Sequence, residues 1–386
     1  MSFQATMTMA GKSSSICANC RNADAFATVR NRPLCQPCFL RYADNKCSSG
    51  MKQYRMLGDA AKTRKQHKHL LPLSFGASSS VLLHMINGQV EHQLAGPLRF
   101  TNYDVHVLVV DPSTISPSRP PCQKQFDLVR QHYPRHKYTM IPLHSIFEYD
   151  PNISETLRQI AGSGFGDDES KPYRERLEAF RASIPTTTSK DDIDNILLFR
   201  LIVAFARHHA CETILWGDSD TRLAAKTLAN VAKGRGASLT WQVRDGPTPW
   251  GLEFIFPLRE LYRTELEQYA KLVPTVESIV IPDPPASEAL SNRDLSIDEL
   301  LNNYVLTQGV KYPGIMANVV RTVNKLQPAG FTSDQARCVL CTSPIEPDNH
   351  GADGAEAFDF DVRNAPTQFC YGCRRSAAGL SQAADT

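Results

Sequence analysis

The stretch that decides the fold is HLLPLSFGASSS, residues 69–80. Its apolar residues 70–73 predict a buried strand, and the small residues after them predict a loop that opens a helix. In a parallel sheet, such a loop presents a phosphate group to the free amides of a helix N-terminus. Phe75 stands where the turn favours glycine, and Ser78 stands where a pyrophosphate loop carries aspartate. The sequence therefore predicts the geometry of a nucleotide loop and leaves its chemistry open.

Strands and helices alternate from residue 66 to about residue 285. Further apolar or β-branched runs predict strands at residues 103–111, 137–143, 213–217, 239–243 and 278–281. Apolar residues at helical spacing predict helices at residues 78–86, 123–132, 191–209, 219–233 and 257–270. This alternation predicts an α/β fold with a Rossmann-like parallel sheet, whose ligands lie beyond the carboxyl ends of the strands.

Three other segments lie inside or after this alternation. Residues 162–190 are rich in Gly, Ser, Asp and Thr around a charged helical stretch, so we expect a flexible insertion. Residues 282–293 predict a linker, and residues 296–308 and 313–326 predict two helices beyond it.

A second loop at the carboxyl end of a predicted strand carries acids. Asp218 and Asp220 follow the strand at 213–217 and would lie at the mouth of the sheet. They suit a ligand there, but Asp218 or Ser219 equally suits an N-cap of the next helix. The candidate, degenerate nucleotide loop therefore comprises Ser74, Gly76, Ser78, Ser79, Asp218 and Asp220.

Composition sets the outer limits. The chain has 386 residues, of which 42% are hydrophobic, so it can form one large or two modest domains. Its net charge of +2 means that any nucleic-acid surface must be local. No run of 18 apolar residues occurs, and residues 1–16 lack the apolar centre of a secretory signal. We expect a disordered tail at residues 1–16 and a cytoplasmic protein.

Eight of the eleven cysteines form four Cys-x-x-Cys pairs. An N-terminal frame and a C-terminal frame each contain two pairs, which are Cys17 with Cys20, Cys35 with Cys38, Cys338 with Cys341, and Cys370 with Cys373. Each frame can supply four thiolates to one tetrahedral zinc ion with no open position, which favours a structural role. Unliganded reduced cysteine, and redox chemistry at a single pair, remain the alternatives.

Basic residues gather just before the first strand of the sheet. No acid occurs over residues 61–69, and positive charge of this density suits a phosphodiester backbone. The candidate RNA-binding residues are Lys62, Arg64, Lys65 and Lys68. A solvated face of a basic helix is the alternative.

The order of these features resembles the PP-loop ATPase family of tRNA thiolases. It runs from zinc ribbon to basic helix, then to a Ser-x-Gly-x-Ser-Ser loop and to GDSDTRLA at residues 217–224 in a Rossmann-like body. Within that family, nearly the whole chain resembles the cytoplasmic tRNA 2-thiolation protein 2 family, the partner subunits of the eukaryotic wobble-uridine thiolase.

The resemblance implies that this chain forms a heterodimer with a catalytic PP-loop subunit. It also implies that this chain helps to bind tRNA. Such a complex 2-thiolates wobble uridine (U34) in cytosolic tRNAs for lysine, glutamate and glutamine, with sulfur from a thiocarboxylated ubiquitin-like carrier. The implied division of this chain is a zinc ribbon at 17–50, a PP-loop-like domain at 51–285, and a helical extension with the C-terminal cysteine frame at 286–386. Zinc is the implied metal.

Two departures from active members concern catalysis. Active members use a Ser-Gly-Gly-x-Asp-Ser loop for ATP, where this chain has Phe75 and Ser78. They also carry a Cys-x-x-Cys pair after the third strand, where residues 142–146 of this chain contain no cysteine. These departures predict a non-catalytic, tRNA-binding subunit without ATP turnover. An active adenylating enzyme and a zinc-dependent scaffold without RNA contact are the alternatives.

Overall fold

The computed structural model describes residues 15–52, 66–115, 119–162, 165–282, 295–327, 330–332, 335–345 and 369–381. The predicted linker at 282–293 lies almost wholly outside these residues. So do residues 1–14 of the predicted tail. Ile16, which was placed in that tail, instead forms an antiparallel bridge with Asp24 and belongs to the N-terminal ribbon.

A six-stranded sheet forms the centre of the fold, with strand order β5-β4-β3-β6-β8-β7. Its parallel strands are β3 (His67–Pro72), β4 (Tyr103–Val110), β5 (Lys137–Ile141), β6 (Thr213–Leu215) and β8 (Glu253–Ile255). The short strand β7 (Gly246–Pro247) adds an antiparallel edge. The parallel α/β sheet predicted from the sequence is confirmed, and its order reverses between β3 and β6.

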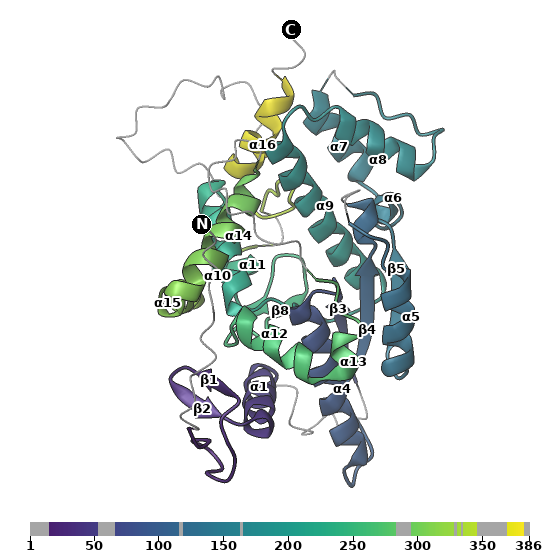
Figure 1. The fold of residues 1–386 in the computed structure, drawn as a ribbon. Coiled ribbons are helices and arrows are strands. Elements are labelled where there is room, and N and C mark those ends of the chain that lie inside the picture. The colour runs from purple at the N-terminus through teal and green to yellow at the C-terminus, as the bar shows by residue number, and fades with distance from the viewer. Residues whose placement is uncertain are drawn as a thin grey trace.

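Helices cover both faces of this sheet because the buried strands are apolar on both sides. One face packs against α4 (Ala77–Ala95), α5 (Gln123–His132), α12 (Arg263–Leu272) and α13 (Pro274–Glu277). The other face packs against α9 (Thr187–His208), α10 (Asp220–Ala232) and α11 (Leu239–Gln242). In Figure 1, α9 runs beside β4 from the end of the molecule that carries the C-terminal helix.

The two cysteine frames lie at opposite ends of the view in Figure 1. The N-terminal frame includes an antiparallel hairpin of β1 (Ala27–Val29) and β2 (Arg32–Leu34), followed by α1 (Gln36–Gly50). The C-terminal frame ends in α16 (Tyr371–Ser381). An antiparallel hairpin thus lies between the first two cysteine pairs.

The predicted helical extension shares the core of the sheet domain. Its helices α14 (Ile297–Lys311) and α15 (Pro313–Lys325) contact α10. Their buried residues Val305 and Val320 belong to the same apolar cluster as Phe254 of β8. The extension is thus packed onto the α/β body and contributes to its core.

The segment at 162–190, predicted from the sequence to be a flexible insertion with a charged helical stretch, contains a packed helix. Residues 173–182 form α8, and Leu177 and Phe180 of this helix are buried. Arg176 binds Asp167 through two hydrogen bonds of 2.8 and 2.6 Å, which ties down the preceding loop. Part of the polar composition is therefore accounted for by helix ends and an ion pair. Short helical elements η2 (Leu143–Ser145), α6 (Ile146–Tyr149) and α7 (Ile153–Ala161) complete this corner.

Two predicted strands are wrong. Residues 239–242 form α11 and Val243 ends it; the buried Leu239, Trp241 and Val243 imitate the alternation of a strand. Residues 278–281 follow α13 and do not join the sheet; Ile281 N donates to Phe75 O at 2.8 Å, so this segment lies across the phosphate-type loop. The strands missing from the prediction are β7, of two residues, and β8, of three residues. Such short apolar runs do not distinguish strand from helix.

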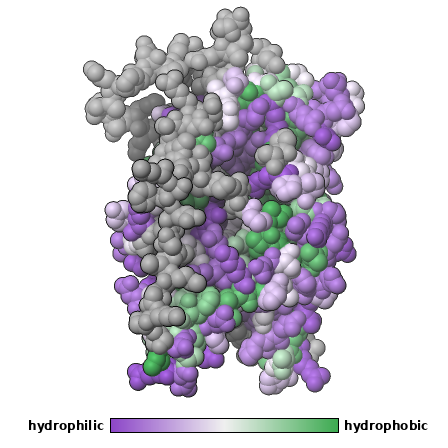
Figure 2. Space-filling view, in the orientation of Figure 1, coloured by the Kyte–Doolittle hydropathy of each residue, from purple (hydrophilic) through white to green (hydrophobic). Residues whose placement is uncertain are grey.

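The hydropathy of the surface (Figure 2) is consistent with a chain that buries its apolar residues in this core. The face in Figure 2 is largely hydrophilic with small, separate apolar areas. Within the described residues, no helix is both long and apolar enough to cross a membrane.

Candidate functional site

The site predicted from the sequence lies where the strand order reverses. The loop after β3 and the loop after β6 emerge there side by side, which is where open α/β sheets bind ligands. The two loops touch at Gly217: a Cβ atom on this residue would lie 2.7 Å from Ser79 Cα. Only glycine permits this approach, so the sequence brings both loops together as expected.

The serine hydroxyls of the first loop bond to one another. Ser74 Oγ lies 3.1 Å from Ser79 Oγ, and Ser79 Oγ donates to Gly76 O at 3.2 Å. Gly76 is the N-cap of α4 and supplies no side-chain cap, so the amides of the first turn keep an arrangement that accepts an anion. Ser78 is half-buried and brings no charge. The loop retains its shape with few groups that could hold a metal–nucleotide.

Phe75 shows that the turn requires the left-handed backbone region. Its φ is 59°, a conformation that favours glycine and costs other residues about 1–2 kcal/mol. Its side chain is fully buried in the cluster between the sheet and the helices α4, α12 and α13. Burying a phenyl ring contributes about 1.5–3 kcal/mol, enough to offset the strain. The residue that departs from the nucleotide motif is thus a structural anchor of the loop.

The two acids of the second loop have different environments. Asp218 forms a 2.5 Å ion pair with Lys226, whose ammonium lies 5.4 Å from the centre of the Trp216 ring. Asp220 is 2% exposed and accepts one hydrogen bond from Thr221 Oγ1 at 3.0 Å. Burial raises the pKa of Asp220 to about 7. Ser219 supplies the N-cap of α10, accepting from Arg222 N at 3.3 Å.

The N-terminal cysteine frame has the dimensions of a single-ion site. Its four sulfur atoms lie within 4.8 Å of one another, and Cys20 Sγ is 3.7 Å from Cys35 Sγ. Four sulfurs at about 2.3 Å from one tetrahedral ion are separated by about 3.8 Å, so these thiols fit. The pKa of Cys17 is lowered to about 6, first by the backbone amide of Cys20 and then by that of Cys35. Such amides stabilise a thiolate ligand.

The N-terminal cysteine frame contacts the segment between β8 and α12. Lys46 of α1 pairs with Glu260 at 2.5 Å. Arg30 of the hairpin donates to Glu260 O and lies 4.9 Å from the centre of the Tyr262 ring. Tyr262 is the N-cap of α12. The ribbon therefore packs against the start of the helix that follows β8, the last parallel strand.

The C-terminal cysteine frame has the same dimensions. Its sulfurs also lie within 4.8 Å of one another, with Cys341 Sγ 3.7 Å from Cys370 Sγ. A 4Fe-4S cluster places each thiolate on a separate iron and needs a wider frame, so one ion fits better. In both frames the four thiols leave no open coordination position, which excludes a metal-bound water as nucleophile.

Two buried arginines connect the C-terminal frame to the sheet domain. Arg200 of α9 donates to Val339 O at 2.7 Å and Leu340 O at 2.8 Å. Arg235, after α10, donates to Cys373 Sγ at 3.7 Å. Neither arginine has a motif around it, and each is distant in sequence from the cysteines, so sequence reasoning missed both.

Asp192 of α9 pairs with the cations next to the C-terminal cysteine frame. It accepts hydrogen bonds from Arg235 at 2.7 and 2.5 Å and from Ser376 of α16 at 2.5 Å. Lys233 lies 2.9 Å away. These donors hold the pKa of Asp192 below its usual range, against the opposing effect of its burial. The thiols, the guanidinium and the carboxylate thus form one buried network.

Of the four predicted RNA-binding residues, the structure describes only Lys68. Lys62, Arg64 and Lys65 lie outside the described residues. Lys68 is exposed but belongs to β3, and so do His67 and His69 on either side of it. The expectation that Lys68 lies in a basic segment before the first strand is therefore wrong, because the strand begins at His67.

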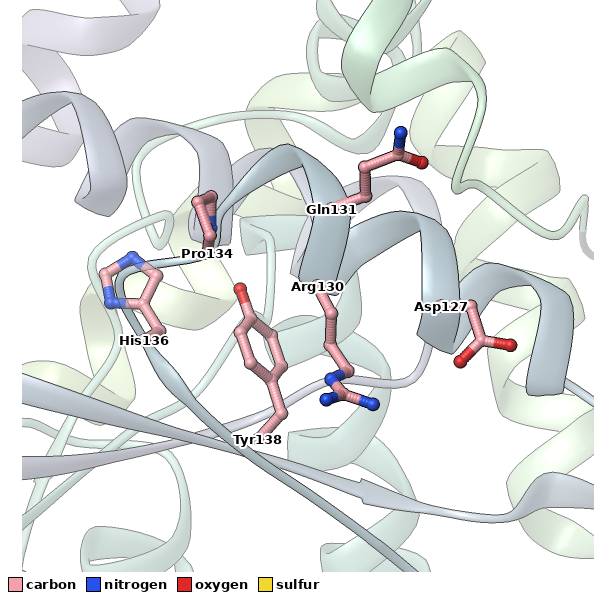
Figure 3. Close-up of a pocket in the computed structure, with 6 residues that line it drawn as sticks. All are labelled: Asp127, Arg130, Gln131, Pro134, His136 and Tyr138. Carbon is pink, nitrogen blue, oxygen red and sulfur yellow. The ribbon is translucent and has the colours of Figure 1, made fainter.

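A separate hollow of about 420 Å³ lies between α5 and β5, at the edge of the sheet (Figure 3). Arg130 and Tyr138 lie side by side in it, with His136 on its far wall. It is distant from the two loops, since the C-terminal end of α5 and the start of β5 lie at the opposite end of the strands. Sequence reasoning did not single out these residues.

Comparisons with known proteins now bear on this geometry. A family model described as Cytoplasmic tRNA 2-thiolation protein 2 matches residues 296–360. The protein of that name from Aspergillus clavatus is 49% identical over 366 residues, covering 95% of this chain and 97% of that protein. The one from Emericella nidulans is 50% identical over 332 residues, covering 86% of this chain and 100% of that protein.

A solved structure supports the fold. The U34-tRNA thiolase NcsA from Methanococcus maripaludis, determined with its 4Fe-4S cluster, matches with a TM-score of 0.56. The match covers 85% of this chain and 92% of the thiolase chain at 13% sequence identity. The sheet domain therefore has the fold of a PP-loop thiolase, and on the sequence matches the chain belongs to the Cytoplasmic tRNA 2-thiolation protein 2 family.

Proposed function

We propose that this chain is the non-catalytic, tRNA-binding subunit of its tRNA 2-thiolation complex. The family supports the role in tRNA 2-thiolation. The observation that carries the non-catalytic part is Phe75: a fully buried ring occupies the left-handed turn of the loop. A residue that the core depends on is not free to open a cradle for ATP. A second observation supports the same conclusion. Residues 142–146, which follow β5 and include η2, contain no cysteine, so the pair that active members carry there is missing.

In this proposal the chain works as a heterodimer with a catalytic PP-loop subunit in the cytoplasm. The partner adenylates U34 of the tRNAs for lysine, glutamate and glutamine, and sulfur arrives as a thiocarboxylate on a ubiquitin-like carrier. This chain contributes tRNA contacts through Lys62, Arg64, Lys65 and Lys68.

Zinc is the proposed metal of both cysteine frames, which act structurally. The sulfur spacing and the four-thiol ligand sets support one zinc ion in each. The ribbon at 17–50 and the extension at 286–386 then frame the PP-loop-like domain at 51–285. The four thiolates of each site would carry two net negative charges with Zn²⁺, and Arg235 offsets part of that charge at the C-terminal site.

ATP binding by the isolated chain tests the non-catalytic assignment. We expect no saturable binding by calorimetry at micromolar to low millimolar ATP, whereas the partner subunit alone should bind. Gly76→Trp is the matched control, since it blocks the N-terminus of α4 outside the core. Micromolar affinity that disappears in Gly76→Trp would show an active loop and refute the proposal.

The tRNA role is tested separately. Replacing Lys62, Arg64, Lys65 and Lys68 together by glutamate should weaken tRNA association of the complex and reduce its salt dependence. Unchanged association at moderate salt would leave the scaffold without RNA contact as the better description.

A further inference from the structure

The amino ends of β3 and β5 carry exposed basic residues, of which only Lys68 belongs to the predicted RNA-binding set. Lys68 near the start of β3 and Lys137 at the start of β5 are both exposed. Side chains alternate along a strand, and the neighbouring Leu70 and Leu108 are buried on the α9 side of the sheet. The register pairs Lys68 with Asp104 and Lys137 with His106, so both lysines point to that same side.

The C-terminal end of α9 joins these lysines. Glu212 N, just beyond the helix, donates to Lys68 O at 2.8 Å. The His106 and His209 rings are 5.0 Å apart between centroids, which places the helix end over β4. Arg207 and His208, both exposed, occupy the last turn of α9. Three separate segments thus bring cations to one end of the sheet.

Lys137 acts electrostatically on the two neighbouring histidines. Burial lowers the pKa of His106 to about 4, and the charges of Lys137 and His209 lower it further. The pKa of His209 is lowered by burial and then by Lys137 and His208. Cations near a helix C-terminus also suit the helix dipole, so Arg207 alone would have an internal explanation. Lys68 lies on the central strand β3 and has no such explanation, whereas Lys137 lies on the edge strand β5, where a lysine also protects the edge.

Three of these four residues lack an ion pair within the described part of the chain, while His208 contacts the rings of Tyr149 and His209. Lys68, Lys137 and Arg207 form no ion pair there, whereas exposed cations elsewhere, such as Arg158 and Arg174, bind nearby glutamates at 2.5–3.0 Å. The nearest acids are few. Asp104 is opposite Lys68 in the register, and Glu212 is bound by His67 at 2.6 Å.

We propose that Lys68, Lys137, Arg207 and His208 form a surface that binds the phosphate backbone of tRNA, at the end of the sheet opposite the degenerate loop. This inference rests on the proposed tRNA-binding role and specifies where part of the binding occurs. Two strand spacings across and two residues along separate the Cα atoms of Lys68 and Lys137 by roughly 12 Å. That separation suits successive backbone contacts by point charges, not one enclosed phosphate.

The edge strand continues the surface toward the hollow of Figure 3. Arg135 is exposed two residues before Lys137, and Arg130 lies at the hollow with no ion pair among the described residues. A backbone that passes over Lys137 therefore meets further positive charge on the other side of β5.

The experiment measures binding of an unmodified, fluorescently labelled tRNA transcript with U34 to the full-length chain in complex with its catalytic subunit. The test variant is Lys137→Glu with Arg207→Glu. The control is Lys271→Glu with Lys325→Glu, two exposed lysines in the last turns of α12 and α15. Both double variants change the net charge equally. Dissociation constants are measured between 50 and 200 mM salt.

We expect the test variant to weaken binding about tenfold at 100 mM salt and to lower the slope of log Kd against log salt by about 2, one for each lost contact. The control should change binding less than twofold. If wild type binds tRNA and the test variant behaves like the control, the surface inference is wrong while the proposed function stands.

Two other outcomes have distinct meanings. Failure of the wild-type complex to bind tRNA would overturn the proposed function itself, and this inference with it. Loss of the catalytic subunit from the test variant in size-exclusion chromatography, with normal melting temperature, would identify the surface as a protein interface and overturn the RNA assignment.

Discussion

The carboxylate of Asp192 is expected to hold the C-terminal cysteine frame onto the sheet domain. It is 2% exposed and contacts Arg235, Lys233 and Ser376, the last of which lies on α16. Asp192→Leu removes the only acid that the described residues place against Arg235. Arg235 would keep only neutral acceptors, Ser376 Oγ at 3.2 Å and Cys373 Sγ at 3.7 Å.

The magnitude follows from the burial of both partners. Removing one member of a buried, hydrogen-bonded ion pair costs about 3–5 kcal/mol, because the other charge stays buried without compensation. We expect that cost for Asp192→Leu. Arg235→Met should cost less, since Lys233 remains 2.9 Å from Asp192 and still balances it. Replacing both residues by apolar side chains of similar volume should restore most of the stability.

The assay is urea unfolding of wild type, both single variants and the double variant, followed by tryptophan fluorescence. A chromogenic chelator reports metal release in the same samples. The double variant should be within about 1 kcal/mol of wild type, which gives a coupling energy of several kcal/mol. It should nevertheless release metal faster, because Arg235 no longer offsets the thiolate charge near Cys373.

Additivity would refute the reasoning. If the cost of the double variant equals the sum of the single costs, Asp192 and Arg235 do not act as a pair. Metal release at the wild-type rate from the restored double variant would show that Arg235 does not support the metal site.

Three further predictions concern the loops and the metal frames. The pKa of Asp220 is raised to about 7, so the folded state binds a proton that the unfolded state releases near pH 4. Stability should therefore fall as pH rises from about 4 to 7, and Asp220→Asn should remove about 2–4 kcal/mol of that fall in melts at pH 5 and 8. Cys35→Ser and Cys341→Ser should each release about one zinc equivalent by elemental analysis, because each breaks one four-thiol site. Phe75→Ala should cost about 3–5 kcal/mol in urea unfolding and still give no ATP binding.

Each of these has a matched comparison. Asp218→Asn changes a carboxylate paired with Lys226 and should not reproduce the pH effect. Cys122→Ser alters a buried cysteine outside both frames and should retain both metals. A stable Phe75→Ala variant would contradict the anchoring role of the ring, and full metal content after Cys35→Ser would contradict the N-terminal site.

The sequence was most informative where local chemistry and periodicity agreed. The helix at 123–132 and the strand at 103–110 have apolar spacings that match one secondary structure only. The Cys-x-x-Cys pairs predicted their own grouping, because thiols two residues apart form a knuckle whatever the rest of the chain does. The two loops could be grouped because both follow predicted parallel strands, whose carboxyl ends meet at one edge of a sheet.

The failures share a different cause. Residues 239–243 and 278–281 are short apolar segments whose structure depends on which neighbour they bury against. The three residues of β8 acquire their strand pairing from β6. Arg200, Arg235 and Asp192 carry no local signal, since each obtains its role from a contact more than 40 residues away. Pattern alone does not contain such contacts.

The degenerate loop shows why loss of a motif need not loosen a fold. A nucleotide loop uses glycine because the turn demands positive φ and because the backbone must approach phosphate closely. Phe75 satisfies the first demand, with φ 59°, and replaces the second with a buried ring. The hydroxyls of Ser74 and Ser79 then bond to each other. The strand, turn and helix are therefore held by apolar burial and internal hydrogen bonds, so their geometry no longer depends on a ligand. A subunit built this way can keep the thiolase fold as a rigid support, while adenylation takes place on its partner.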